Sequence, residues 1–333
     1  MDNMVSSYIK GMGYYVPDRV IDNSYFTDFM DTSDKWIRER TGIEERRFAA
    51  PDQGPSDIAV PAVEMALQNS NLNTNDIDFI IFATSTPDYY IPGAGCLIQD
   101  KMNFNNIGSL DIRNACSGFI FALSIADQYI KAQTYKNILV IAAEVQSTAM
   151  DLSNDGRDTA IIFADGAAAA VISSTTDDKG ILSTHLHSNG KYAKELWVEA
   201  PSSKKKPRLN QNILNQGKHF LKMNGKEVFR HAVKLFPDVI MEGLRYNNLT
   251  TEDIDLLIPH QANLRISKMI QKKLKLTDNQ VVSNIHKYGN TTAASVPIAL
   301  CESIMDNKLK KGDILVLAAF GSGFSWGSAI LKW

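Results

Sequence analysis

The chain has 333 residues, of which 44% are hydrophobic and 22% charged, with a formal net charge of −2. This length suits one large or two medium domains with a sizeable core, and the near-neutral charge argues against nucleic-acid binding. The three cysteines, Cys96, Cys116 and Cys301, are too few and too scattered for a disulfide framework or a metal site. With no signal-peptide pattern and no apolar run of membrane-spanning length, we expect a cytoplasmic protein that is not inserted in a membrane.

The first half of the chain alternates predicted helices with predicted buried strands. A helical pattern over 60–69 leads through an Asn-rich turn into 77–84, which is too short and too β-branched for a helix. A second helical pattern over 117–132 precedes a buried strand over 137–144. Strands that alternate with helices predict parallel sheets covered on both faces.

Two pairs of segments repeat within the chain at nearly one offset. Residues 67–81 and 244–258 are identical at eight of fifteen positions, 177 positions apart. Residues 138–143 and 314–319 are identical at five of six positions, 176 apart. The chain is therefore predicted to be a duplication. Two sheets related by pseudo-symmetry predict a layered α/β/α/β/α fold, in which the loops after matching strands converge.

The repeats divide the chain into predicted halves 1–178 and 179–333. The second half repeats the order of helix and strand, with elements predicted over 226–246, 254–260, 293–307 and 313–320. Segment 190–222 breaks this periodicity and carries a basic run, Lys204 to Arg208, beside prolines. It predicts a long surface insertion, and insertions of this length are usually lids or flexible connections.

Cys116 lies in the stretch "DIRNACSGF", where a predicted strand ends and a helix begins. If the helix begins just after it, the sulfur lies at the positive end of the helix dipole, which favours a thiolate. Ser117 and Gly118 leave room for a substrate. A lone cysteine beside an apolar helix can equally be buried and inert.

Two polar residues of the second half are candidate partners of Cys116. His260 directly follows the repeated strand, where α/β folds place ligands and catalytic groups. Asn290 lies in a Gly-Asn turn before a helix of small residues, close to the position that matches Cys116. Each has a structural alternative, a backbone-bonded histidine and a turn or cap asparagine. Pseudo-symmetry predicts that all three meet between the halves.

Seven motifs in order give the chain a resemblance to a known family. It resembles β-ketoacyl-acyl-carrier-protein synthase III, the thiolase-like condensing enzyme that starts fatty-acid synthesis, in "WIRERTGIEERR", "DIRNACSGF", "IIFADGAAAAV", "MNGKEVF", "IPHQANLRI", "HKYGNTTAASVP" and "FGSGFSWGSA". The motifs run from about residue 36 to the C-terminus. The resemblance implies a duplicated five-layer thiolase-like fold, a homodimer, and a coenzyme A thioester as substrate with no other cofactor and no metal.

The resemblance places the family's catalytic triad on Cys116, His260 and Asn290, and its backbone oxyanion hole on the N–H groups of Cys116 and Ser322. A cysteine thiolate can attack an acyl-CoA thioester to give an acyl-enzyme. The enolate formed when malonyl-acyl carrier protein loses CO₂ then attacks that thioester and gives 3-ketoacyl-acyl carrier protein. Histidine and asparagine side chains can donate hydrogen bonds to the enolate oxygen.

The resemblance also implies residues that bind the two substrates. Coenzyme A contacts fall on Trp36, Arg40, Arg157, Gly225 and Asn263. An aromatic ring beside guanidinium groups suits a nucleotide with phosphates. Contacts with the acidic carrier protein fall on Arg230, Arg265, Lys272 and Lys273. Independently, a basic residue recurs every four positions and predicts one helical stripe, made of Lys222, Lys226, Arg230 and Lys234. Such runs usually mean a solvated helix face.

One departure from the family concerns the acyl group. The family often has an aromatic residue in the loop "PDYYIPGAG" that limits the acyl pocket across the dimer, and this chain has Ile91 there. A smaller branched side chain leaves room for a longer or branched starter. Acetyl specificity therefore stays open.

Other functions stay open at this point. Hydroxymethylglutaryl-CoA synthases need an added catalytic glutamate, for which Glu144 is the nearest candidate. Plant-type polyketide synthases share the triad but are usually longer and take malonyl-CoA. A specialised paralogue of the synthase, for an unusual lipid or a secondary metabolite, would keep the triad. A catalytically silent subunit would be expected to lose it. A dinucleotide-binding enzyme has only the fragment "IKGMGYYVP" in its favour.

Overall fold

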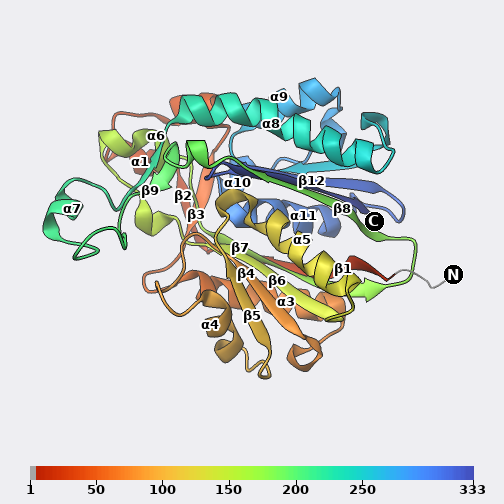
Figure 1. The fold of residues 1–333 in the computed structure, drawn as a ribbon. Coiled ribbons are helices and arrows are strands. Elements are labelled where there is room, and N and C mark those ends of the chain that lie inside the picture. The colour runs from red at the N-terminus through yellow and green to blue at the C-terminus, as the bar shows by residue number, and fades with distance from the viewer. Residues whose placement is uncertain (1–4) are drawn as a thin grey trace.

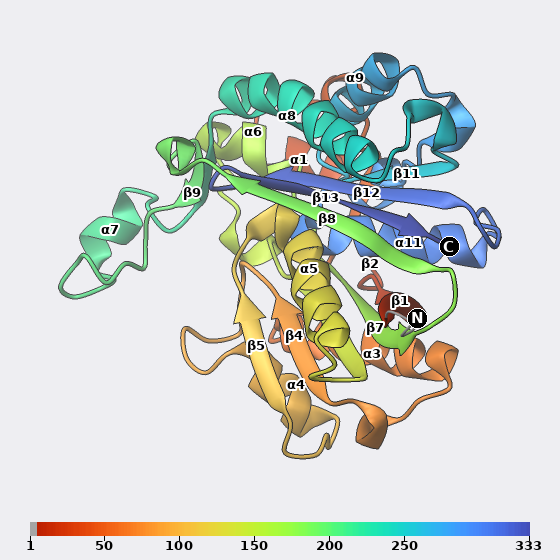
Figure 2. The same cartoon turned by 45° about the vertical axis from the view of Figure 1, so that its right-hand side comes forward.

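The computed structural model describes residues 5–333, which fold into alternating layers of helices and sheets (Figures 1 and 2). A five-stranded sheet and a four-stranded sheet are stacked with helices between them and on both outer faces. From one outer layer to the other, the helices are α3 (Pro55–Ser70) and α4 (Ala94–Lys101), then α5 (Gly118–Lys131) and α11 (Ser295–Met305), then α8 (Gly225–Tyr246) and α9 (Leu264–Leu274). The predicted α/β/α/β/α fold is confirmed, whereas the boundary of the halves at 178 stays a prediction.

The strand order is β1-β7-β6-β4-β5 in the first sheet and β11-β12-β13-β8 in the second. The strands are β1 (Ser6–Tyr15), β4 (Phe79–Ala83), β5 (Gly108–Ile112), β6 (Asn137–Glu144), β7 (Gly166–Thr175), β8 (Gly180–Ser188), β11 (Leu256–Pro259), β12 (Ile314–Gly321) and β13 (Ser325–Lys332). Strand β4 runs parallel to β5 and β6, and β11 runs parallel to β12, but the other pairs are antiparallel. The prediction of parallel sheets is confirmed for the three parallel pairs and wrong for the antiparallel ones. Strands β12 and β13, for example, are joined by a turn of three residues, which only antiparallel strands allow.

The central strands are buried on both faces, which explains their continuous apolar sequences. Strand β6 is buried from Ile138 onward and β12 from Leu315 onward. Strand β7 instead carries four successive buried alanines, Ala167 to Ala170. Alternate alanines belong to the cores on opposite faces of the sheet, so their small size lets helices approach both faces closely.

Short elements surround the N-terminal end of helix α2 (Asp34–Thr41). They are β2 (Arg19–Asp22), which pairs with β3 (Glu45–Phe48), and the helices α1 (Ser24–Thr27), α6 (Arg157–Ala160) and α10 (Ile285–Tyr288). The fully buried Arg46 joins them, because its guanidinium donates to Asn23 Oδ1 at 2.8 Å and to the Ile161 carbonyl at 2.7 Å. Asn23 in turn donates to Asp34 of α2 at 2.9 Å, so Arg46 connects α2 through Asn23 to the residue that follows α6.

Helix starts at the predicted binding residues are capped by side chains. Asn224 accepts from the Glu227 N–H at 3.4 Å before α8, and Asn263 accepts from the Arg265 N–H at 2.9 Å before α9. Such caps satisfy backbone donors that have no partner within the helix. Within residues 5–333, none of the helices combines the length and apolar character that a membrane crossing requires.

Segment 190–222 leaves the layered body, as expected for a surface insertion. It contains β9 (Leu196–Val198), which pairs with β10 (Leu221–Met223), and α7 (Gln211–Asn215) at its far end. Figures 1 and 2 show α7 projecting away from the rest of the chain. The basic run Lys204 to Arg208 is exposed.

Gly13 offers a test of the close packing between β1 and α3. A Cβ there would lie 2.6 Å from the Ala66 backbone nitrogen and even closer to the Ala62 carbonyl oxygen. Gly13→Ala should therefore lower the free energy of unfolding by about 1–3 kcal/mol, as expected for overpacking. Urea unfolding would measure it. Gly190→Ala is the matched control, because nothing lies within 4 Å of its added Cβ. Equal midpoints for both variants would contradict this packing.

Candidate active site

The thiol of Cys116 lies in a tight turn between β5 and α5. Residues Ala115–Ser117 form a single 3-10 turn, and Cys116 is 4% exposed. The Ser117 hydroxyl donates to the Asn114 carbonyl at 2.8 Å and lies 2.7 Å from the hydroxyl of Ser325 on β13. The second half of the chain thus helps to hold the turn that carries the cysteine.

A matching turn of the second half packs against the cysteine turn. Residues Thr292–Ala294 form a 3-10 turn before α11, and Thr292 lies 177 positions after Ala115. Both residues have left-handed backbones, with φ of 44° at Ala115 and 52° at Thr292. Such geometry costs about 1–3 kcal/mol for a residue other than glycine. A Cβ on Gly118 would lie 3.3 Å from Ala293 Cβ, so these two strained turns meet at the junction of the sheets.

The end of β12 closes the site from a third side. A Cβ on Gly321 would lie 2.7 Å from Cys116 Cβ and 3.0 Å from the Cys116 nitrogen, so no larger residue fits. This approach brings the Ser322 N–H to the sulfur, where it and the Cys116 N–H favour the thiolate and lower the pKa of Cys116. These two amides are the ones predicted to form the backbone oxyanion hole.

His260 directly follows β11 and is 1% exposed. Its N–H donates to the Ala318 carbonyl on β12 at 2.8 Å, and its Nδ1 lies 2.5 Å from Ser295 Oγ. Because a hydroxyl can donate or accept, Ser295 can hold either tautomer of the ring. Burial lowers the pKa of His260 to about 3. The imidazole is therefore neutral at neutral pH.

Asn290 is fixed through its backbone and its side chain. Its N–H donates to the Ile162 carbonyl, and its carbonyl accepts from the Ala164 N–H, each at 2.9 Å. Its Oδ1 accepts from the Thr292 N–H at 2.8 Å. With the carboxamide oxygen engaged in this way, the Nδ2 group is left to donate elsewhere.

Segment 290–295 joins the three predicted catalytic residues. Its first residue, Asn290, bonds to the turn that packs against the Cys116 turn, and its last, Ser295, bonds to His260. The structure therefore brings the predicted triad into one buried region between the sheets.

A cavity of about 620 Å³ opens onto this region. Its lining includes Cys116, Thr292 and Ser322, together with Ser85, Thr86, Tyr89, Tyr90 and Gln146. His260 and Asn290 are buried and do not belong to this lining. Ile91 is 79% exposed and does not line it either, so it does not limit the cavity of its own chain.

The surroundings of Cys116 favour the protonated thiol over the thiolate. Burial raises the pKa of Cys116 to about 12, and the negative charge of Glu144 also raises it. Burial therefore opposes the thiolate that a helix start is expected to favour. The turn lies inside the core, where loss of hydration outweighs the two amides. His260, with a neutral ring, is the imidazole that the fold places in the same buried region.

The predicted coenzyme A residues gather around Trp36. The Arg157 guanidinium lies 4.7 Å and the Arg40 guanidinium 5.1 Å from the centre of the indole ring. The Asn263 side chain donates to the Arg40 carbonyl at 3.0 Å. Gly225 opens α8, with Met223 Cε 3.8 Å from the position of an added Cβ. Four of these five predicted residues are thus connected by direct contacts.

The predicted carrier-protein residues are exposed on α8 and α9, which pack side by side (Figure 1). Several of their charges have acidic neighbours, because Arg230 lies 2.5 Å from Glu227 and Lys273 lies 3.5 Å from Asp238. Arg265 lies over the ring of Phe229 on α8. Lys272 lies on the same helix as Arg265 and Lys273.

The predicted basic stripe begins later than expected. Lys222 lies on β10 and not on α8, because the chain turns at the Asn224 cap before the helix starts. The prediction that all four basic residues lie on one helix is therefore wrong for Lys222. Lys226, Arg230 and Lys234 remain on one helix.

Sequence reasoning missed two residues that support the site. In the sequence, Ser295 is one of several small residues at a predicted helix start, and nothing in the sequence indicates that it contacts His260. Thr292 lines the cavity, and its hydroxyl is buried with no hydrogen-bond partner among the described residues. Both contacts arise only from the fold.

Family models match the chain in two regions. The model described as 3-oxoacyl-[acyl-carrier-protein (ACP)] synthase III matches residues 110–190, and the one for its C terminal matches 244–333. A β-ketoacyl-[acyl-carrier-protein] synthase III of Clostridioides difficile is 44% identical over 325 residues, which is 98% of each chain. The chain belongs to the 3-oxoacyl-[acyl-carrier-protein] synthase III family. It is a thiolase-like condensing enzyme, an acyltransferase of fatty-acid biosynthesis.

Solved structures of the synthase III family share this fold. The 3-oxoacyl-[acyl-carrier-protein] synthase III of Aquifex aeolicus matches with a TM-score of 0.90 at 39% identity, over 98% of this chain and 100% of that one. The priming β-ketosynthase of the R1128 polyketide biosynthetic pathway matches with a TM-score of 0.90 at 31% identity, over 98% and 96%. The family resemblance in the sequence is confirmed.

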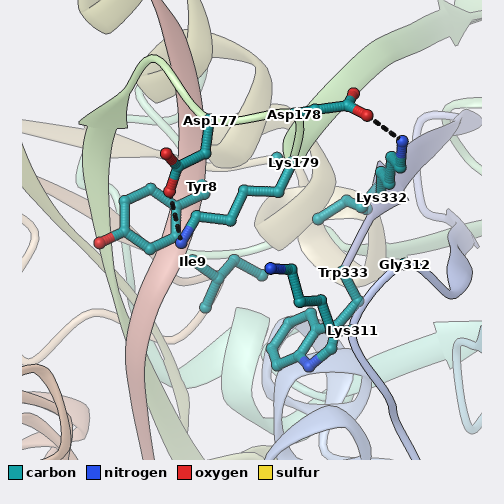
Figure 3. A pocket seen from close by; sticks show the side chains of 11 residues that line it. Tyr8, Ile9, Asp177, Asp178, Lys179, Lys311, Gly312, Lys332 and Trp333 are labelled. Atoms are coloured by element: carbon teal, nitrogen blue, oxygen red, sulfur yellow. Dashed lines mark hydrogen bonds and ion pairs between the residues drawn. The ribbon is translucent and has the colours of Figure 1, made fainter.

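A larger cavity of about 840 Å³ lies elsewhere, between β1, the β7–β8 turn and the C-terminus. Figure 3 shows Lys179 beside Asp177 and Lys332 beside Asp178, so acidic neighbours balance two of its lysines. It contains none of the predicted site residues. Among the described residues, no three His, Cys, Asp or Glu side chains are grouped to bind a metal.

The protonation state of Cys116 can be measured by alkylation. Modification by iodoacetamide should still be accelerating at about pH 10, because a thiol with a pKa of about 12 yields ever more thiolate. Peptide mapping separates Cys116 from the exposed Cys96. A rate that reaches its maximum by about pH 8 and rises no further at higher pH would show that the helix start does stabilise a thiolate.

Proposed function

We propose that the chain condenses an acyl-CoA starter with malonyl-acyl carrier protein through an acyl-enzyme on Cys116. The observation that carries this is the meeting of Cys116, His260 and Asn290 between the two sheets, with two backbone amides at the sulfur. The family membership supplies the substrate classes. The product is 3-ketoacyl-acyl carrier protein, which starts fatty-acid synthesis.

In the first half-reaction, the Cys116 sulfur attacks the thioester carbonyl of the acyl-CoA. His260 accepts the thiol proton on Nε2 while Ser295 accepts the Nδ1 proton, an arrangement that the 2.5 Å contact permits. The N–H groups of Cys116 and Ser322 stabilise the tetrahedral oxyanion. Collapse breaks the C–S bond to coenzyme A, whose thiolate takes the proton from His260. The enzyme is left acylated.

In the second half-reaction, malonyl-acyl carrier protein loses CO₂, and the electron pair of the broken bond forms an enolate. Asn290 Nδ2 and the Nε2–H tautomer of His260 donate to the enolate oxygen, with Ser295 now donating to Nδ1. The enolate carbon attacks the Cys116 thioester. This attack forms the new carbon–carbon bond and a second tetrahedral oxyanion, whose collapse breaks the bond between the carbonyl carbon and the Cys116 sulfur. The released Cys116 thiolate takes a proton from water. These steps require neither a metal nor an organic cofactor.

Trp36, Arg40, Arg157 and Asn263 are proposed to hold the nucleotide of coenzyme A. A half-buried indole between two guanidinium groups offers a stacking surface beside phosphate-binding donors. Gly225 is proposed to let the coenzyme approach the start of α8. The exposed basic residues of α8 and α9, namely Arg230, Arg265, Lys272 and Lys273, are proposed to dock the acidic carrier protein.

We also propose a homodimer in the cytoplasm. Strand β5 lies at the edge of its sheet, and the neighbouring loop exposes Tyr89, Tyr90 and Ile91. An exposed strand edge beside an apolar loop suits pairing with a second copy. In such a pair, Ile91 of one chain would limit the acyl pocket of the other. A branched aliphatic residue there favours starters longer than acetyl.

The assigned roles separate in half-reaction assays. Cys116→Ser should abolish the mass increase seen after incubation with a panel of acyl-CoAs, whereas Cys96→Ser should keep it. Asn290→Ala should still be acylated but should release CO₂ from malonyl-acyl carrier protein about 10²–10³-fold more slowly, the usual cost of one oxyanion donor. His260→Ala should slow both half-reactions. Normal decarboxylation by Asn290→Ala would remove that residue from the mechanism.

The two proposed binding surfaces should respond to different substrates. Arg157→Ala should raise the KM for acyl-CoA about tenfold, and Arg265→Glu should raise the KM for the carrier protein with acylation unchanged. Lys311→Glu, at the cavity of Figure 3, is a charge-reversal control that should change neither. If one variant raised both the KM for acyl-CoA and the KM for the carrier protein, the two substrates would not bind to separate surfaces.

A further inference from the structure

Glu144 is a buried carboxylate for which the proposed reaction has no use. It ends β6 and is 0% exposed. Its carboxylate accepts the Ser85 N–H at 3.1 Å, the Ser85 hydroxyl at 2.9 Å and the Thr86 hydroxyl at 2.8 Å. The Gln146 amide lies 3.4 Å away. A buried carboxylate is costly unless hydrogen bonds compensate its lost hydration, and Glu144 has such bonds.

These donors form part of the catalytic cavity. Ser85, Thr86 and Gln146 all line it together with Cys116, so Glu144 lies directly behind its wall. The carboxylate also receives the Ala293 N–H, which belongs to the turn that packs against the cysteine turn. The Glu144 side chain thus connects the end of β4 and the end of β6 to the turn at 292–294 in the second half of the chain.

The charge of Glu144 is coupled to the nucleophile. Burial raises the pKa of Glu144 to about 7 despite its hydrogen bonds, and its negative charge in turn raises the pKa of Cys116. Its hydrogen-bond partners from residues 84–86, 146 and 293 are hydroxyl and amide groups. Asp165, just before β7, is the other buried carboxyl beside residues 146–147. The pKa of His260 is lowered by burial.

We propose that Glu144 is a positioning residue that braces the wall of the catalytic cavity and, through its charge, adds to the resistance of the buried Cys116 to ionisation in the resting enzyme. This rests on the proposed function, in which Cys116 is the nucleophile. The carboxylate does not take the thiol proton, which passes to His260 and then to coenzyme A. Its charge instead sets how readily that proton leaves.

The charge effect has a specific signature in the alkylation rate of Cys116. Below about pH 7 Glu144 is neutral, and above it the carboxylate opposes the thiolate, so the logarithm of the rate should flatten near pH 7 and then rise again. Glu144→Gln should remove this shoulder. Its rate should match that of the unchanged protein at about pH 5.5 and exceed it about three- to tenfold at pH 8.

Asp165→Asn is the matched control. Asp165 is buried and accepts the Ser147 hydroxyl at 2.6 Å and the Ala49 N–H at 2.7 Å, yet its charge is not among the influences on Cys116. This variant should keep the shoulder near pH 7. The charge role is overturned if Glu144→Gln keeps the shoulder, or if both variants lose it.

Ser85→Ala tests the same idea without removing the carboxylate. Losing the hydroxyl donor to the charged form should raise the pKa of Glu144 further, so the shoulder should move to higher pH. An unchanged shoulder would overturn the coupling even if Glu144→Gln failed to fold.

The bracing role of Glu144 is tested by steady-state kinetics of Glu144→Gln, in which kcat should fall by a larger factor than the KM for acyl-CoA changes. Alkylation needs no substrate, so failure of Cys116 to become acylated would refute the proposed function separately.

Discussion

The site depends on the close contact between two equivalent turns, one from each half of the chain. Gly321 has no room for a side chain because Cys116 occupies the space, and Ser325 meets the hydroxyl of Ser117. Ala115 and Thr292, one in each turn, both have strained left-handed backbones. The packing energy of two sheets and their intervening helices outweighs that strain, so the turns stay where the reaction needs them.

The same contact determines the acid–base chemistry, because it excludes water from the sulfur and the imidazole. At pH 7 a thiol with a pKa of about 12 is ionised in about one molecule in 10⁵, a cost of about 7 kcal/mol for a preformed thiolate. Attack in which the thiol proton leaves as the carbon–sulfur bond forms never accumulates a free thiolate, and His260 is the proposed acceptor of that proton. A neutral ring also suits the second half-reaction, in which it must donate to an enolate without bringing a charge of its own.

Much of the fold and of the candidate site follows from the sequence, but what depends on burial does not. The repeats at offsets of 176 and 177 are enough to predict the layers, and the positions of Cys116, His260 and Asn290 in them predict convergence. The antiparallel strands were missed because a helix–strand alternation does not reveal a hairpin such as β12–β13. The thiolate was expected because sequence locates a helix start but does not show that it lies in the core. For the same reason, the sequence offered Glu144 only as the catalytic glutamate of a different reaction.

The arrangement of the two proposed binding surfaces explains how one thiol can serve two large thioesters. Asn263 caps α9, which carries Arg265, and its side chain also donates to the Arg40 carbonyl beside Trp36. The proposed nucleotide surface and the proposed carrier-protein surface therefore share a rigid connection at one rim. Two bulky substrates that converge on one buried sulfur from one rim cannot occupy it together. An acyl-enzyme that stores the first acyl group while coenzyme A leaves is the chemical solution to this geometry, and it requires the ordered exchange of a ping-pong reaction.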